Sequence, residues 1–172
     1  LFPINLPSMK WLQFPAKGFS ERVVGVIHRT DKPAVCGMPL GGIDTGCIDL
    51  ETTGVLGYCT IFNSHVPRRG PLNLPFLGLS VGRTPWTSST RVDILSTREF
   101  SGIGRIKDTC YWGHYPVADF EYEMDGPISV GLRAWSPFIP GDVAVSNTPG
   151  TVFEVHLRNI SSATQDGTLV FS

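Results

Sequence analysis

Glycine and proline interrupt this sequence so often that helices of ordinary length have almost no room to form. The 172 residues include 19 glycines and 14 prolines, well above the roughly 12% of average usage. Only two stretches without either residue are longer than ten residues, Trp86–Ser101 and Thr151–Asp166. Because proline breaks helices and glycine weakens them, the sequence excludes an all-helical protein. It also excludes a parallel α/β fold, which needs a helix after almost every strand.

Alternating apolar and polar side chains predict strands instead. The segments Thr151–Arg158, Ser129–Trp135 and Val117–Met124 each alternate with the period of two that a half-buried antiparallel strand requires. Asp125-Gly126-Pro127 predicts a turn between the last two. Further predicted strands are Arg22–Arg29, Thr45–Glu51, Leu56–Phe62, Phe76–Gly82 and Arg91–Ser96, and the predicted loops are Val66–Pro75 and Ser136–Gly150. Short strands without helices between them favour an all-β, antiparallel sandwich or barrel.

Charge and hydropathy exclude several classes of partner. The formal net charge is −1, from 14 Lys+Arg and 15 Asp+Glu, so the chain lacks the basic surface of a protein that binds nucleic acid or anionic membranes. No apolar run approaches the roughly 18–20 residues of a transmembrane helix.

The two ends of the sequence suggest that it is part of a longer protein. Leu1–Pro7 has no initiating methionine, and prolines interrupt the stretch where a signal peptide would be continuously apolar. Gly167–Ser172 is typical of the opening of a strand. We therefore expect a fragment, and with no visible signal peptide a cytoplasmic location is slightly favoured while the compartment stays open.

The four cysteines do not have the spacing of a metal site. Cys36, Cys47, Cys59 and Cys110 form no C-x-x-C pair and have no paired histidines, so we predict no zinc. Buried thiols are the favoured interpretation, and disulfides stay open because sequence spacing does not set the Cα–Cα distance.

Gly78-Leu79-Ser80-Val81-Gly82 matches the G-x-S-x-G pattern of a hydrolase nucleophile. That pattern places its serine on a tight turn between a strand and a helix. The residues after Gly82 have no apolar periodicity of a helix. We therefore predict that Ser80 lies in a buried strand where small side chains allow close packing.

Three carboxylates, Asp119, Glu121 and Glu123, share one face of a predicted strand. Their spacing of about 6.6–6.8 Å resembles the separation of the two carboxyls in inverting glycosidases. Side chains on one strand face point in parallel, however, and cannot approach a glycosidic bond from opposite sides. A solvated face is the favoured interpretation, with a calcium-binding surface as the alternative.

Two further patterns are interpreted as structural. Gly41–Gly46 lacks the Gly-Lys-Ser/Thr of a phosphate-binding loop, and Gly102-Ile103-Gly104 lacks the third glycine of a dinucleotide fingerprint. Their glycines are expected to allow a positive φ or a close approach of two backbone segments.

The aromatic run Cys110–Tyr115 favours core packing, with stacking on sugar rings as the alternative.

Several strings in order resemble the N-terminal domain of glycoside hydrolase family 116, the non-lysosomal glucosylceramidase and bile-acid β-glucosidase family. The best match is Val130–Asp142, which is similar to the family's strand-then-loop signature. The other matching strings are Met38–Gly46, Ile61-Phe62-Asn63, Tyr115-Pro116 with Phe120-Glu121, and Thr151–Asn159. One departure is Asp44, which stands where the family's turn usually has another glycine; aspartate tolerates such turns.

The resemblance implies a two-sheet antiparallel β-sandwich whose chemistry lies elsewhere. It implies a Glu nucleophile and an Asp acid/base on a C-terminal toroid of paired helices, and nothing in this chain corresponds to that domain. We therefore expect residues 1–35 to be a lead-in with the first strand, and 36–172 to be part of one sandwich. No catalytic residue, cofactor or metal ligand is assigned. The expected partner is the catalytic domain of the same polypeptide, which binds a glucoside or glucosylceramide-type substrate.

Two other functions remain as alternatives. A free-standing carbohydrate-binding or interaction module is suggested by the aromatic run Tyr111–Tyr115, and a small serine hydrolase by Ser80. If the chain is a fragment, strands that should follow Thr151–Arg158 are missing and leave unpaired edges. We then expect the isolated chain to lack glucosidase activity and to be aggregation-prone or marginally folded.

Overall fold

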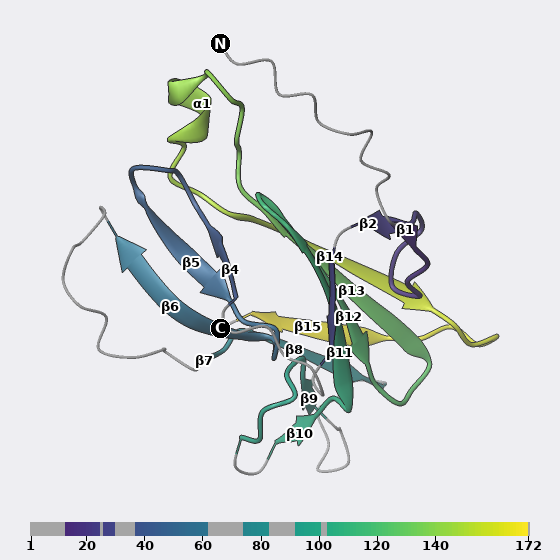
Figure 1. The fold of residues 1–172 in the computed structure, drawn as a ribbon. Helices are drawn as coiled ribbons and strands as arrows, with labels where there is room; N and C mark the ends of the chain where they lie inside the picture. The colour runs from purple at the N-terminus through teal and green to yellow at the C-terminus, as the bar shows by residue number, and fades with distance from the viewer. Residues whose placement is uncertain are drawn as a thin grey trace.

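The computed structural model describes residues 13–24, 26–29, 37–61, 74–82, 92–100 and 103–171. Almost all regular structure within them is strand (Figure 1). In this part of the chain the regular helical structure is α1 (Val143–Ser146), a single turn. The all-β prediction is therefore confirmed, and no described helix has the length and apolar character needed to cross a bilayer.

One layer of the fold is a five-stranded antiparallel sheet. Its strands lie in the order β14-β13-β12-β11-β3. Their bounds are β3 (Val26–Arg29), β11 (Asp108–His114), β12 (Val117–Glu123), β13 (Ile128–Trp135) and β14 (Val152–Asn159). Gly126, in the predicted turn between β12 and β13, has a φ of 142°, a conformation that glycine adopts without steric cost.

The second layer consists of two four-stranded sheets rather than one. The first has the order β4-β5-β6-β7 and the second the order β10-β9-β8-β15. Their bounds are β4 (Met38–Leu40), β5 (Gly46–Leu50), β6 (Val55–Ile61), β7 (Leu74–Pro75), β8 (Leu77–Val81), β9 (Val92–Ile94), β10 (Gly104–Arg105) and β15 (Gly167–Phe171). Phe76 alone separates β7 from β8, so one extended segment joins the two sheets. The pair β9–β10 is parallel, and the other pairs of this layer are antiparallel.

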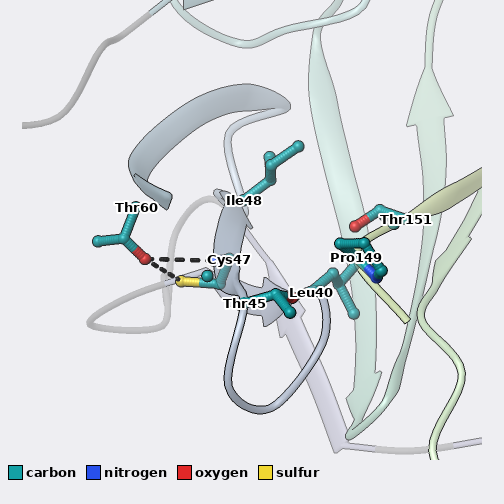
Figure 2. Close-up of a pocket in the computed structure, with 10 residues that line it drawn as sticks. Leu40, Thr45, Cys47, Ile48, Thr60, Pro149 and Thr151 are labelled. Carbon is teal, nitrogen blue, oxygen red and sulfur yellow. Dashed lines mark hydrogen bonds between the residues drawn. The ribbon is translucent and has the colours of Figure 1, made fainter. Parts of the chain in front are cut away.

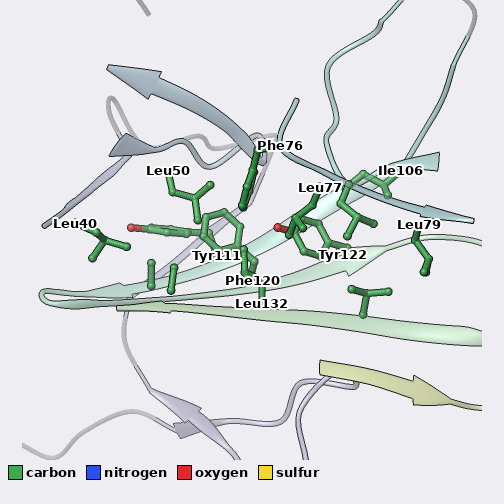
Figure 3. Packing of buried hydrophobic residues seen from close by; sticks show 14 of the residues in the cluster. Leu40, Leu50, Phe76, Leu77, Leu79, Ile106, Tyr111, Phe120, Tyr122 and Leu132 are labelled. Atoms are coloured by element: carbon green, nitrogen blue, oxygen red, sulfur yellow. The ribbon is translucent and has the colours of Figure 1, made fainter. Parts of the chain in front are cut away.

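The main core lies between these layers (Figure 3). Phe120 and Leu132 of the five-stranded sheet are fully buried, and Leu50 and Phe76 of the second layer are 0% and 1% exposed. The predicted alternation of β13 is confirmed, because Val130, Leu132 and Ala134 are all inaccessible. Two-layer packing of this kind defines a β-sandwich.

A short N-terminal segment covers the outer face of the five-stranded sheet. This segment, residues 13–24, is called the strap and contains β1 (Gln13–Phe14) and β2 (Val23–Val24), which pair antiparallel. Its buried Ala16, Phe19 and Val23 form a second core with Trp112 of β11. The predicted strand Arg22–Arg29 is wrong as a single unit, because β2 pairs with β1 while β3 pairs with β11.

The strap also explains why β11 was not predicted as a strand. Tyr111 faces the main core, whereas the neighbouring Trp112 faces the strap, and each is only 4% exposed. A strand that is buried on both faces shows no alternation of apolar and polar residues. Tyr111 and Trp112 of the aromatic run therefore serve core packing, as favoured above, and are closed to stacking on sugars, whereas Tyr115 of the same run is 46% exposed.

The remaining strand predictions agree with the structure within one or two residues at each end. Of the predicted loop Val66–Pro75, Leu74 and Pro75 form β7 and the rest lies outside the described residues. The predicted loop Ser136–Gly150 contains α1. The short strand β4 was missed because its central Pro39 is unusual in a sheet; β4 is an edge strand, where proline is tolerated.

One carboxylate beneath the strap makes folding sensitive to pH. Glu121 Oε2 accepts a hydrogen bond from the backbone N–H of Lys17 at 2.9 Å. Burial nevertheless raises the pKa of Glu121 above its usual 4.5, and this effect exceeds the opposing effect of the Lys17 bond. Ionisation of Glu121 is therefore less favourable in the folded than in the unfolded state.

We expect Glu121→Gln to raise the free energy of unfolding at neutral pH. This added stability should disappear as pH falls through the raised pKa of Glu121. Below the pKa that Glu121 has in the unfolded chain, its carboxyl is protonated in both the folded and the unfolded state. The difference in free energy of unfolding between Glu121→Gln and the native chain is then lost. Urea unfolding at neutral pH and at about pH 4 measures the effect. Glu123→Gln, at the exposed neighbour on the same face, is the control; an equal gain there would contradict the role of burial.

Candidate functional site

Three connections gather at one end of the sandwich, here called the loop end. They are the β4–β5 turn, the β11–β12 turn at Tyr115-Pro116, and the β13–β14 connection that carries α1 (Figure 1). The backbone N–H of Ile43 donates to the carbonyl of Ser146 at 3.0 Å. The rings of Tyr115 and Phe138 meet edge to face, with centroids 5.4 Å apart. Segments about 100 residues apart in the sequence thus form one surface.

The β4–β5 turn is shaped to receive the segment after α1. A Cβ on Gly42 would lie 2.8 Å from the backbone carbonyl carbon and oxygen of Asn147, so this close approach requires glycine. The Asn147 side chain accepts a hydrogen bond from the N–H of Asp44 and donates one to its carboxylate, each at 3.2 Å. Asp44, the residue that departs from the family pattern, therefore connects the two loops.

The connection around α1 is held by its own side chains. Asp142 caps the turn and accepts a hydrogen bond from the N–H of Val145 at 3.0 Å. The hydroxyl of buried Ser146 donates to the carbonyl of Ile139 at 3.0 Å and accepts from its N–H at 3.1 Å. These bonds hold an irregular segment in one conformation, as a recognition surface requires.

This ordered surface exposes large apolar side chains. The group is called the apolar rim and comprises Ile43 (52% exposed), Tyr115 (46%), Phe138 (37%), Ile139 (51%) and Val143 (70%). Scattered apolar residues are normal on a protein surface, but a group of them on fixed loops indicates an interaction site. The rim was not predicted from the sequence, although apolar residues within a proline- and glycine-rich loop were the available signal.

A small cavity of about 190 Å³ lies beside the apolar rim, between β4, β5 and the start of β14 (Figure 2). Leu40, Ile48 and Pro149 supply its apolar walls, and Thr45 and Thr151 are among its polar groups. Cys47 also lines it, with its Sγ 3.4 Å from the hydroxyl of Thr60. The volume is large enough for a single side chain of a partner.

Ser80 does not occupy a nucleophile turn. It lies inside β8, opposite Thr168 on one side and Val92 on the other, and is 5% exposed. A serine in the middle of a paired sheet cannot present its hydroxyl as a nucleophile elbow does. The prediction of a buried strand is confirmed, and the serine-hydrolase alternative loses its geometric basis.

The solvated-face interpretation of the three carboxylates is wrong for Asp119. This residue is 1% exposed and binds Arg133 of β13 through two hydrogen bonds, Nε to Oδ1 at 2.8 Å and Nη2 to Oδ2 at 3.0 Å. The guanidinium carbon of Arg133 lies 5.7 Å from the ring centroid of Phe19, so the strap covers the ion pair. Glu121 is half-buried, and only Glu123 is exposed.

The described residues contain no assembled catalytic or metal centre. Within them, no group of three or more histidine, cysteine, aspartate or glutamate side chains could hold a metal ion. Cys47, Cys59 and Cys110 are half-buried thiols without a disulfide among the described residues, and Cys36 lies outside them. Asp119 is 1% exposed and both of its carboxylate oxygens bind Arg133.

The fold and the loop end define a β-sandwich domain whose most distinctive described surface is a group of exposed apolar side chains on hydrogen-bonded loops. Residues 37–172 match the family model described as "beta-glucosidase 2, glycosyl-hydrolase family 116 N-term". The chain therefore belongs to the N-terminal domain family of glycoside hydrolase family 116, and the resemblance drawn from its sequence is confirmed. A comparison with curated proteins finds no match.

Proposed function

We propose that this sandwich packs against a separate catalytic domain of the same polypeptide and helps to shape the rim of its active site. The observation that carries the proposal is the apolar rim, which is exposed on loops that are internally hydrogen-bonded. One string that resembles the family, Met38–Gly46, contacts Ser146 and Asn147 through Ile43 and Asp44, and these two residues follow shortly after the second string, Val130–Asp142.

The family description supports a β-glucosidase as the parent enzyme. In this proposal the helical catalytic domain supplies the Glu nucleophile and the Asp acid/base and binds the glucoside. A glucosylceramide-type substrate is the narrower form of the proposal. Residues 36–172 are part of one sandwich domain, and residues 1–35 are a lead-in with the first strand, β3, which joins its five-stranded sheet.

The reading frame beyond the codon for Ser172 provides the first test. We expect it to encode a helical domain that carries a pair of catalytic carboxylates. A stop codon directly after Ser172 would overturn the proposal for this molecule.

The second test measures docking through the apolar rim. With the sandwich and the catalytic domain produced separately, Val143→Asp and Ile139→Asp are each expected to weaken their association about tenfold or more. The reason is that a charge replaces apolar surface that docking would bury, at a cost of about 1–3 kcal/mol. Titration calorimetry gives the dissociation constants, and circular dichroism checks that the variants fold.

Ile160→Asp provides the matched control. Ile160 is 57% exposed, but its N–H binds Pro127 next to the β12–β13 turn, at the end of β13 away from the loop end. We expect this variant to bind the catalytic domain like the native sandwich. Equal weakening by Val143→Asp and Ile160→Asp would show that the apolar rim is not the docking surface.

A further inference from the structure

The apolar rim is assembled from separate connections, so its shape depends on how those connections are held together. Ile43 lies on the β4–β5 turn, whereas Val143 lies in α1 on the distant β13–β14 connection. Their side chains are 52% and 70% exposed, and neither loop presents both of them by itself. A partner that recognises the two side chains together therefore requires a fixed arrangement of the two loops.

Asn147 connects the two loops through both its backbone and its side chain. Its backbone N–H donates to the carbonyl oxygen of Val143 at 3.0 Å, within the loop that carries α1. Its side-chain Oδ1 accepts from the N–H of Asp44, and its Nδ2 donates to Asp44 Oδ2, each at 3.2 Å. Asp44 is the residue next to Ile43. One residue therefore sets the position of Val143 relative to Ile43.

The chemistry of this pair suits orientation better than stabilisation of the fold. An asparagine amide both donates and accepts, so it matches the N–H and the carboxylate of Asp44 at the same time. Both hydrogen bonds are exposed to solvent. Hydrogen bonds between exposed groups replace bonds to water and contribute little to the free energy of unfolding. Their main effect is therefore expected in how the two loops are held relative to each other.

We propose that Asp44 and Asn147 are positioning residues for docking, which hold Ile43 and Val143 in the arrangement that the catalytic domain recognises. This inference rests on the proposed docking of the apolar rim. Neither residue belongs to the rim, so the pair acts on affinity by fixing the loops before contact. A surface that is already ordered loses less conformational entropy on binding. Without the pair, part of the docking free energy is spent on ordering the two loops.

Exchange of the two side chains tests the pair in the full parent polypeptide. That protein is folded intact and then cleaved at a protease site engineered between the sandwich and the catalytic domain. Size-exclusion chromatography over a dilution series gives the dissociation constant of the two parts. Asn147→Asp places two carboxylates face to face and should raise this constant about three- to tenfold. The double variant Asp44→Asn/Asn147→Asp again pairs an amide with a carboxylate and should restore the native value.

Two further measurements separate positioning from a merely structural role. Hydrogen exchange of the cleaved-off sandwich segments 41–46 and 138–147 should become faster in Asn147→Asp and return to the native rate in the double variant. The urea midpoint for unfolding of the sandwich should stay unchanged, because the main core is not involved. Asn159→Asp is the matched control. Asn159 is exposed at the other end of β14, and this variant should dock like the native protein.

Val143→Asp in the same cleaved protein distinguishes this inference from the proposed function. If Val143→Asp weakens association while Asn147→Asp leaves it unchanged, the positioning role is overturned and docking through the apolar rim stands. A double variant that stays as weak as Asn147→Asp alone would also overturn the positioning role. If neither Val143→Asp nor Asn147→Asp weakens association, the docking proposal fails and this inference fails with it.

Discussion

Replacing Phe120 by alanine is expected to remove a large part of the stability of this domain. Phe120 is 0% exposed at the centre of the main core. Its ring meets Tyr111 edge to face at 4.9 Å between centroids and stacks on Tyr122 at 6.0 Å. Removing a buried phenylalanine costs about 3–5 kcal/mol, compared with about 5–15 kcal/mol for the whole stability of a typical domain. Urea unfolding followed by tryptophan fluorescence measures the loss.

Phe138→Ala makes the same chemical change at an exposed position. Phe138 is 37% exposed and lies on the apolar rim, so its truncation opens no enclosed cavity. We expect a loss of no more than about 1 kcal/mol. A similar loss in both variants would show that Phe120 does not sit at the centre of a tightly packed core.

Replacing Gly18 by alanine is expected to detach the strap from the sheet. An added Cβ would lie 2.5 Å from the backbone nitrogen of Gly131 and 2.7 Å from the carbonyl carbon of Val130. Both atoms belong to β13, an interior strand of the five-stranded sheet, whose backbone cannot move without disturbing the main core. Such overpacking costs about 1–3 kcal/mol, and relief by detachment exposes Phe19 and Trp112, which are 6% and 4% exposed in the intact fold.

Limited proteolysis and hydrogen exchange of residues 13–24 measure this detachment. In Gly18→Ala we expect faster cleavage and loss of amide protection in the strap, together with a change in tryptophan fluorescence from Trp112. Gly150→Ala is the matched control, because a Cβ there meets no heavy atom within 4 Å. A strap equally protected in both variants would contradict the close contact between Gly18 and β13.

The positions of most strands could be predicted from the sequence because one face of each is buried. The alternation in Val117–Met124 and Ser129–Trp135 reflects a main core on one side and polar groups on the other. Two of the elements that were not predicted show no such alternation. β11 is buried on both faces, and the strap carries too few residues in each strand to show any period.

The candidate site was less accessible to sequence reasoning than the fold. The residues of the apolar rim lie in the connections between strands, and Val143 lies in the single turn of α1. These segments are too short or irregular for a periodic pattern to show whether an apolar side chain is buried or exposed. Contacts such as that between Asp44 and Asn147 join residues 103 positions apart. These contacts depend on how the two loops pack against each other in the folded chain. The number of residues between two loops does not show whether they will be in contact.

By itself, then, the sequence determined the all-β class, the main strands, the structural role of Gly78–Gly82 and the family. These properties follow from side-chain periodicity and backbone restriction, which act over a few residues. Only the tertiary structure decided that Asp119 is buried in an ion pair with Arg133, that the second layer consists of two sheets, and that the apolar rim forms one surface. Each of these depends on which distant segment covers a residue, because burial is a property of the packed chain and not of its local pattern.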